Sequence, residues 1–264
     1  MEERAEQRGE ELAQLLTRLG PTFIKVGQSL SIRTDLLSPA YVRGLSTLQD
    51  QVPAFDTPTA KQILQQEWGQ SVESVTEGAF PSKPIAAASL GQVYKATLKS
   101  TGQVVAIKVQ RPAITEQIAL DMHLLREAAP VARRTFNLNS DTVGTVDAWG
   151  SGFVDELDYL AEAKNAAFFS EKIKETPLRD VVFAPKVISD YSTDSVLVTE
   201  WVDGERLDRS SSEDVAVLCS IAMNAYLTMM LEMGVLHCDP HPGKKQTTTL
   251  LFGITHPLDS FRWC

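Results

Sequence analysis

The sequence predicts an α+β fold, in which a helical N-terminal extension precedes an antiparallel sheet that is followed by further helices. Three observations support this class. Residues 1–83 carry apolar side chains at helical spacing. Two runs rich in Val and Ile then flank Thr101-Gly102, which is the pattern of an antiparallel hairpin. Most of the remaining chain returns to helical spacing, and 264 residues suffice to bury a sizeable core.

Composition excludes several classes of protein. The net charge of -9 argues against nonspecific nucleic-acid binding, so we expect no nucleic-acid partner. Cys219, Cys238 and Cys264 have no spacing typical of a disulfide framework or a zinc site, which favours a reducing compartment. The acidic start of the chain has neither signal-peptide nor transit-peptide character. Either the protein is not imported or a presequence is missing, and the compartment stays open.

The helical extension is expected to contain four helices, at residues 6–19, 22–30, 38–48 and 57–68. The second helix carries Lys25, Gly27 and Gln28. A glycine inside a helix costs about 1 kcal/mol relative to alanine, so Gly27 predicts close contact with another element. The alternative is an ordinary surface lysine beside a packing glycine.

The hairpin begins at a loop of small residues, Ala86-Ala87-Ala88-Ser89. Small side chains let a ligand approach the backbone, whose N–H groups bind phosphate well in turns. The second strand ends in Lys108, a single lysine in an apolar run, so its ammonium should leave the sheet toward a negative group. An ordinary hairpin with a solvated lysine is the alternative.

Helical regions follow the hairpin. Arg111-Pro112 ends the strand, and Pro130 kinks or divides the next helix. A further helix is expected at residues 154–172, with Glu156, Asp158 and Glu162 along it. Asp158 and Glu162 share a face and repel, which favours a nearby cation or metal, although solvated helix charge is the alternative.

Two short strands are expected at residues 180–183 and 195–199, the second leading into the linker from Glu200 to Gly204. A helix capped by Ser211 or Ser212 then runs to Met233. Asn224 and Glu232 interrupt its apolar run, which predicts a buried helix and not a membrane span. Two prolines stiffen the loop that follows, which carries His237, Asp239 and His241.

In this order, from about Leu12 to Gly243, the motifs closely resemble those of the UbiB family of atypical protein-kinase-like proteins, also called ADCK or aarF-domain proteins. The matching motifs are Lys25-Val26-Gly27-Gln28, Ala86-Ala87-Ala88-Ser89, Lys108, Glu156-Leu157-Asp158, Glu162, and His237-Cys238-Asp239-Pro240-His241-Pro242-Gly243.

The resemblance implies a kinase-like N-lobe that binds ATP with magnesium. Lys108 would contact the phosphates and pair with Glu162, and the alanine-rich loop would replace the glycine-rich loop of other kinases. Backbone groups near Glu200 and Val202 would hold adenine, and Asp239 would be the catalytic aspartate. The remaining implied roles belong to four residues that would lie over the active site and obstruct a protein substrate: Lys25, Gln28, Glu156 and Asp158.

The family resemblance also implies a link to isoprenoid quinones or other prenyl lipids, with a lipid or membrane surface and lipid-biosynthesis proteins as partners. Family members occur in bacteria, mitochondria and chloroplasts. These expectations concern the family, and no feature of this N-terminus selects one compartment.

The end of the chain departs from the family pattern. Lys244 stands where the family has a magnesium-binding Asn, and Leu251-Phe252-Gly253 stands where Asp-Phe-Gly is expected. Lysine cannot ligate a metal in place of these groups. We therefore expect a truncated chain with three parts: the extension at 1–83, the kinase-like N-lobe and hinge at 84–204, and an incomplete helical C-lobe at 205–264. The helix at 215–233 would then expose apolar surface.

Three functional hypotheses follow. The first is an ATP-binding atypical kinase or ATPase acting in quinone or prenyl-lipid metabolism. The second is a catalytically inactive nucleotide-binding or scaffold fragment that acts through a partner. The third is a metal-dependent hydrolase using His237, Asp239 and His241, for which no second ligand cluster is evident.

Overall fold

The computed structural model describes residues 2–32, 34, 37–49, 52–135, 137, 141–203 and 215–235. The chain forms two compact units. The first unit comprises Met1–Ile63, Pro81–Tyr94 and Lys108–Leu157, and the second unit comprises Leu64–Phe80, Lys95–Ile107 and Asp158–Cys264. The predicted three-part division at residues 83 and 204 follows motif order and stays a prediction.

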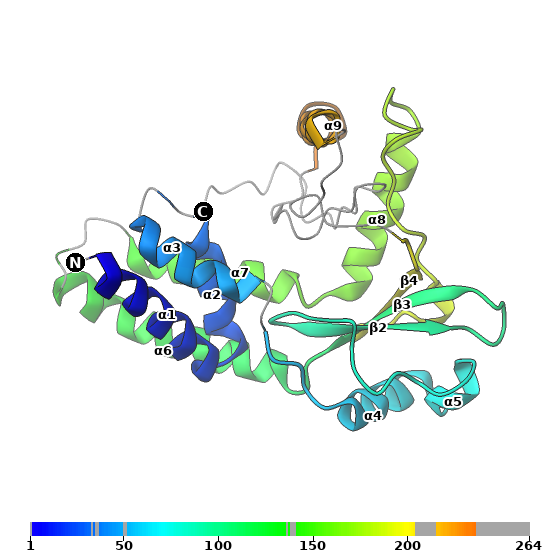
Figure 1. Cartoon of the computed structure of the whole chain (residues 1–264), viewed down its shortest axis with the longest axis horizontal. Coiled ribbons are helices and arrows are strands. Elements are labelled where there is room, and N and C mark those ends of the chain that lie inside the picture. Colours follow the sequence, from blue (N-terminus) through cyan, green and yellow to red (C-terminus); the bar gives the residue numbers. More distant parts are fainter. Residues whose placement is uncertain are drawn as a thin grey trace. The chain divides into compact units, whose positions relative to one another are not determined.

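The first unit begins with a helical bundle. Helices α1 (Glu2–Leu19), α2 (Pro21–Ser31) and α3 (Pro39–Ser46) pack against one another, and the 3-10 turn η1 (Thr47–Gln49) follows (Figure 1). Their shared core consists of Ala13, Leu16, Ile24, Leu45, Leu48 and Val52. A Cβ at Gly27 would collide with the side chains of Leu48 and Leu16, so the predicted close contact at Gly27 is confirmed.

Two further helices, α6 (Ile114–Thr135) and α7 (Thr142–Asp155), belong to the first unit. Helix α6 packs against α7, and Leu90, Ile114, Ile118, Phe153 and Leu157 form a second core there. Pro130 lies inside α6, which continues through it as one helix and is not divided.

The predicted start of the helix at residues 154–172 is wrong, because this helix begins at Tyr159 and not at Val154. Helix α7 ends at Asp155, and α8 (Tyr159–Ile173) begins anew because the Asp158 carboxylate caps it, accepting a hydrogen bond from the Ala161 N–H at 2.7 Å.

The sheet has four strands in the order β1-β2-β3-β4, namely β1 (Ala86–Ala87), β2 (Gly91–Thr97), β3 (Val104–Gln110) and β4 (Val196–Glu200). β1 pairs with β2 antiparallel, with Ala86 opposite Val93. The predicted Thr-Gly hairpin is present, and Gly102 adopts a φ of 67° in its turn. The predicted α+β class, with an antiparallel sheet and a helical extension, is confirmed (Figure 1).

The strand predicted at residues 180–183 is wrong. Backbone N–H groups of Val181 and Val182 both donate to the Leu178 carbonyl, so the segment is a turn. Its apolar character serves packing, because Val182 is fully buried in the core of the second unit. The strand predicted at 195–199 corresponds to β4.

The core of the second unit lies between α8 and α9 (Val215–Thr228), whose last turns continue as the π-helix η4 (Met229–Met233). It consists of Phe169, Ile173, Val182, Ala184, Ala222, Ala225 and Met229. The remaining described helical elements are α4 (Thr57–Trp68), α5 (Val72–Val75) and the 3-10 turn η2 (Ser189–Tyr191).

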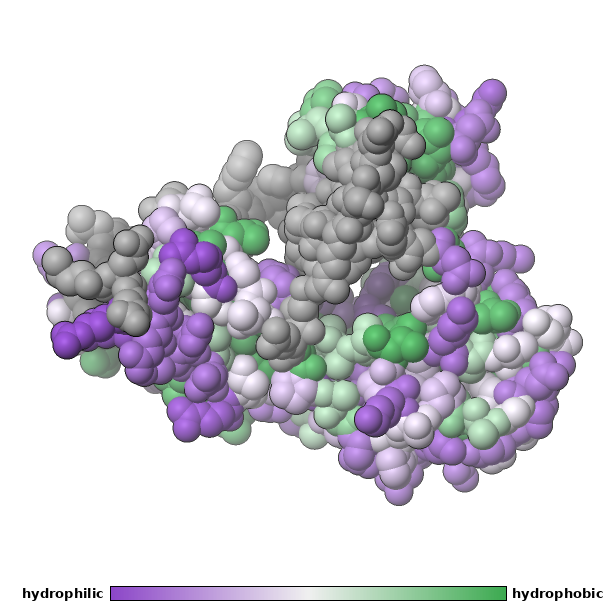
Figure 2. Space-filling model, viewed as in Figure 1, coloured by the Kyte–Doolittle hydropathy of each residue, from purple (hydrophilic) through white to green (hydrophobic). Residues whose placement is uncertain are grey.

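Only one side of α9 and η4 packs against this core. The outer side exposes Val217, Met223, Leu227, Met230 and Leu231, and hydrophobic residues gather at the position of α9 in Figure 2. Ala216–Met233 is long and apolar enough to cross a membrane by length and composition, and only 17% of it is buried. The prediction of a buried helix is therefore wrong, whereas the prediction of exposed apolar surface on this helix is confirmed.

Candidate nucleotide-binding site

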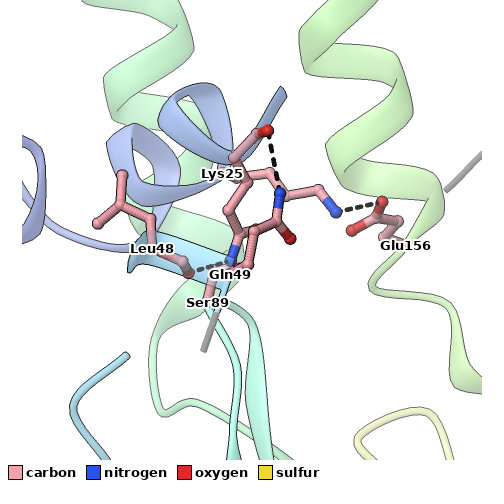
Figure 3. A network of polar contacts seen from close by, with 6 residues as sticks. Lys25, Leu48, Gln49, Ser89 and Glu156 are labelled. Atoms are coloured by element: carbon pink, nitrogen blue, oxygen red, sulfur yellow. Dashed lines mark hydrogen bonds and ion pairs between the residues drawn. The ribbon is translucent and has the colours of Figure 1, made fainter. Parts of the chain in front are cut away.

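An ion pair joins two of the motifs that the sequence singles out. Lys25 Nζ on α2 lies 2.7 Å from Glu156 Oε1, immediately after α7 (Figure 3). The Lys25 side chain is only 12% exposed and that of Glu156 28%, so water screens the attraction weakly. The two charges satisfy each other in a place where either alone would be costly.

One turn further along α2, Gln28 reaches two other segments. Its Nε2 donates to the Leu48 carbonyl at 2.8 Å, and its Oε1 accepts a long hydrogen bond from Ser89 Oγ at 3.5 Å. Gln49 Nε2 donates in turn to the Gln28 carbonyl at 3.2 Å and to Ser31 Oγ at 3.0 Å. Gln28 thus joins α2 to the alanine-rich loop, and the buried Ser89 hydroxyl is its anchor there.

The alanine-rich loop, residues 86–89, is partly a strand and partly a turn. Ala86 and Ala87 form β1, and the Ala88 N–H donates to the Gly91 carbonyl at 2.8 Å. Ala86 and Ala88 are exposed and carry only methyl groups. A ligand can therefore approach the backbone of this loop closely.

Arg111 holds the loop from another side, and the sequence reasoning did not identify it. Its Nε and Nη2 donate to the Ala88 carbonyl at 3.3 and 3.1 Å, and Nη2 also donates to the Pro53 carbonyl. The guanidinium lies 5.7 Å from the centre of the Phe55 ring. Burial lowers the pKa of Arg111. A basic residue directly before Pro112, three positions after the strand lysine, was the available signal.

A buried polar network fixes the segment on which Arg111 rests. Gln92 and Phe55 exchange two hydrogen bonds, with Phe55 N–H donating to Gln92 Oε1 at 3.1 Å and Gln92 Nε2 donating to the Phe55 carbonyl at 3.2 Å. Gln92 Nε2 also donates to the Tyr94 hydroxyl at 2.6 Å, which lies 3.1 Å from Thr57 Oγ1. These buried polar groups therefore have partners, as a rigid site requires.

The strand lysine lies where the alternation predicts. Val105, Ile107 and Val109 are fully buried on one face of β3, and Lys108 lies half-buried on the other. Its small neighbour on that face, Ala106, is also half-buried. The donor chemistry therefore suits a phosphate: one lysine ammonium, and a loop without bulky side chains.

The acidic cluster on α8 has a structural explanation. Asp158 is the N-cap and Glu162 lies in the first turn, where the helix dipole stabilises negative charge. This accounts for two carboxylates four residues apart without a metal. Among the described residues, no group of three or more His, Cys, Asp and Glu side chains could hold a metal ion. Pairing of Glu162 with Lys108 stays a prediction.

In the second unit, the segment after β4 is held by backbone and side-chain contacts. Glu200 N–H donates to the Lys186 carbonyl at 2.8 Å, and Trp201 N–H donates to the Val104 carbonyl at 3.0 Å. Lys95 Nζ lies 4.4 Å from the centre of the Trp201 ring and 3.7 Å from Asp203 Oδ1. Half-buried Val202 lies between these anchored residues.

The predicted catalytic loop, including Asp239, His237 and His241, lies outside the described residues, as do Lys244 and Leu251-Phe252-Gly253. The hypothesis of a metal-dependent hydrolase rests on these residues and stays a prediction.

Comparison with known proteins identifies similar chains. The profile of the ABC1 atypical kinase-like domain matches residues 47–256. An uncharacterised chloroplastic aarF domain-containing protein kinase of Arabidopsis thaliana is 41% identical over 239 residues, which cover 89% of this chain and 33% of that protein. The chloroplastic protein ACTIVITY OF BC1 COMPLEX KINASE 3 of the same organism is 39% identical over 254 residues, which cover 94% and 35%.

An uncharacterised protein of Synechocystis sp. is 41% identical over 244 residues, which cover 90% of this chain and 42% of that protein. The chain thus spans about a third of the length of the first two relatives, 33% and 35%, and 42% of the third.

Proposed function

The chain belongs to the ABC1 atypical kinase-like family, and on this premise we propose that it binds ATP between the alanine-rich loop and Lys108. We further propose that the protein is an atypical kinase or ATPase that acts in the metabolism of prenyl lipids such as isoprenoid quinones. Sequence resemblance supports the lipid assignment, and the site chemistry supports nucleotide binding.

The observation that carries the proposal is the double attachment of α2. Lys25 pairs with Glu156 at 2.7 Å, and Gln28 accepts from Ser89 of the alanine-rich loop. Three motifs that are far apart in the sequence, the Lys25–Gln28 motif, the alanine-rich loop and Glu156, thus lie in one compact unit that also contains Lys108. An ordinary helix with a surface lysine would not bring these groups together.

Each residue has a specific role in this proposal. The Lys108 ammonium neutralises phosphate charge, and the loop backbone donates N–H groups to phosphate oxygens. Because the Glu200 N–H already donates to Lys186, Glu200 would contribute its carbonyl to adenine, and Val202 would contribute its backbone. Bound ATP would supply the phosphoryl group, and Mg²⁺ would neutralise its charge.

The helical extension supports a small acceptor. Gln28 attaches α2 to the loop itself, and Lys25 attaches it to Glu156. A protein substrate that must reach the phosphates would therefore have to displace α2. A small acceptor, such as a lipid headgroup or water, needs less space. This argument favours lipid phosphorylation or ATP hydrolysis over phosphorylation of proteins.

The proposal is tested by Lys108→Met in the full chain. We expect the variant to lose the thermal shift that ATP produces in the wild-type chain, because the ammonium serves the ligand and not the core. The unfolding temperature without ATP should stay within a few degrees of wild type. Lys174→Met, at an exposed ion pair after α8, is the matched control and should keep the full ATP shift. An unchanged shift in Lys108→Met would refute the site.

The exposed apolar side of α9 favours a second candidate, a nucleotide-binding module that acts through a protein partner and does not turn ATP over. ATP binding with no detectable release of phosphate, in the presence of Mg²⁺, would support this module. Phosphate release that disappears in Lys108→Met would support the enzyme.

A further inference from the structure

The side chain of Arg111 connects two backbone segments of the first unit. Two of its nitrogens donate to the Ala88 carbonyl, at 3.3 and 3.1 Å, and one of them also donates to the Pro53 carbonyl. The half-buried guanidinium lies beside the Phe55 ring, 5.7 Å from its centre. The acceptors of these Arg111 hydrogen bonds are therefore all main-chain carbonyls.

These bonds determine the direction of neighbouring N–H groups. In a planar trans peptide the C=O and the following N–H point in opposite directions. A guanidinium that holds the Ala88 carbonyl therefore orients the Ser89 N–H away from Arg111. The Arg111 backbone N–H donates to the Leu90 carbonyl at 3.0 Å, which orients the Gly91 N–H in the same manner. Arg111 thus holds two peptide planes of one turn.

Arginine is suited to this task in a way that lysine is not. Its planar fork can hold two acceptors at fixed angles, whereas an ammonium is a point charge on a flexible stem. Neutral carbonyls do not repay the cost of taking a cation out of water as a carboxylate would. Overall stability is therefore a weak explanation for an arginine here, and control of backbone orientation is a stronger one.

We propose that Arg111 is a positioning residue that holds the alanine-rich loop in the backbone conformation that receives nucleotide phosphate. The inference rests on the proposed nucleotide binding and extends it to a residue that need not touch the nucleotide. Gln28 holds the same loop through the Ser89 side chain, and Arg111 holds it through the Ala88 backbone. Arg111 also ties the loop to Pro53, which lies within the helical extension between η1 and α4.

The test uses Arg111→Met and Arg111→Lys in the full chain, with two measurements. Hydrogen exchange without nucleotide should be about tenfold faster at residues 88–91 in Arg111→Met, and unchanged in α1–α3. Titration with ATP that carries a fluorescent N-methylanthraniloyl group, in the presence of Mg²⁺, should give a Kd about tenfold higher. Arg111→Lys should fall between wild type and Arg111→Met in both measurements.

Arg126→Met is the matched control, because Arg126 forms an exposed ion pair with Asp147 on the same unit and should leave both measurements unchanged. Equal acceleration of exchange in the loop and in α1–α3 would show that Arg111 only stabilises the fold, and would overturn the proposal. An unchanged Kd beside a faster loop would also overturn it. If the wild-type chain fails to bind the nucleotide while exchange accelerates in the loop alone, the proposed function fails and the loop-holding role stands.

Discussion

The polar cluster around α2 and the outer side of α9 differ in whether other residues of the chain contact the helix side chains. Around α2, Lys25 pairs with Glu156 and Gln28 donates to the Leu48 carbonyl, and the apolar side chains of the α1–α3 core are buried. On α9, the apolar residues Met223, Leu227 and Leu231 face outward without cover from other described residues. The contacts of the polar cluster can be tested by the stability of the chain itself, whereas the role of the α9 surface must be tested by measuring association with other molecules.

The largest effect should come from breaking the ion pair of the polar cluster. Lys25→Met should lower the free energy of unfolding by about 2–4 kcal/mol, because Glu156 keeps a poorly screened charge. The double variant with Glu156→Gln should recover much of this loss. Chemical denaturation measures both. The exposed pair Arg126–Asp147 has a similar distance of 2.8 Å, and Arg126→Met should change the free energy of unfolding far less than Lys25→Met does, because water screens this pair. If Lys25→Met and Arg126→Met lowered the free energy of unfolding equally, the half-buried pair would be no more important to stability than the exposed pair.

A smaller effect should separate two helical glycines. Gly27→Ala should destabilise the chain by about 1–2 kcal/mol, because the new methyl group collides with Leu48 and Leu16 and outweighs the better helix propensity of alanine. Gly152→Ala in α7 meets nothing within 4 Å and should stabilise the chain by up to about 1 kcal/mol. Thermal unfolding of both variants gives the comparison, and the same sign in both would contradict it.

The smallest effect on stability should come from the outer side of α9. Replacing Met223, Leu227 and Leu231 by serine should change the free energy of unfolding by less than about 1 kcal/mol, since these side chains are already exposed. Self-association, measured by sedimentation equilibrium, should decrease. Met229→Ala on the buried side of the same helical run is the control and should cost about 2 kcal/mol or more. A loss of that size in the serine variant would mean that the outer side is covered.

The sequence predicted most reliably where local chemistry and periodicity agree. The Thr101-Gly102 turn and the alternation around Lys108 predict the hairpin, and the structure contains it. The strand prediction at residues 180–183 is wrong because the apolar run Val181-Val182-Phe183 also suits a turn whose side chains pack into a core, as Val182 does. Asp158 is predicted to lie within a helix, but it is the N-cap of α8. An N-cap aspartate and a surface aspartate are the same residue type, and only the backbone conformation at that position distinguishes them.

Within the candidate site, motif order located α2, the alanine-rich loop and Glu156, and the structure brings Lys25 to Glu156 and Ser89 to Gln28. Arg111 was missed because its partners are carbonyls of Ala88 and Pro53, which leave no side-chain signal in the sequence. The roles of Lys108, Glu162 and Asp239 in catalysis remain predictions.

The segment Glu156-Leu157-Asp158 is engaged at every residue. The first side chain pairs with Lys25, the middle carbonyl accepts from Gln110, and the last side chain caps α8. The chain passes from one compact unit to the other between the second and third of these residues. Glu156 and Leu157 are adjacent in the sequence, and each bonds to a different element of the first unit, Lys25 on α2 and Gln110 on β3. Inserting one residue between them would keep both residues but move one of the two groups away from its partner. The spacing of these two residues is therefore constrained along with their types.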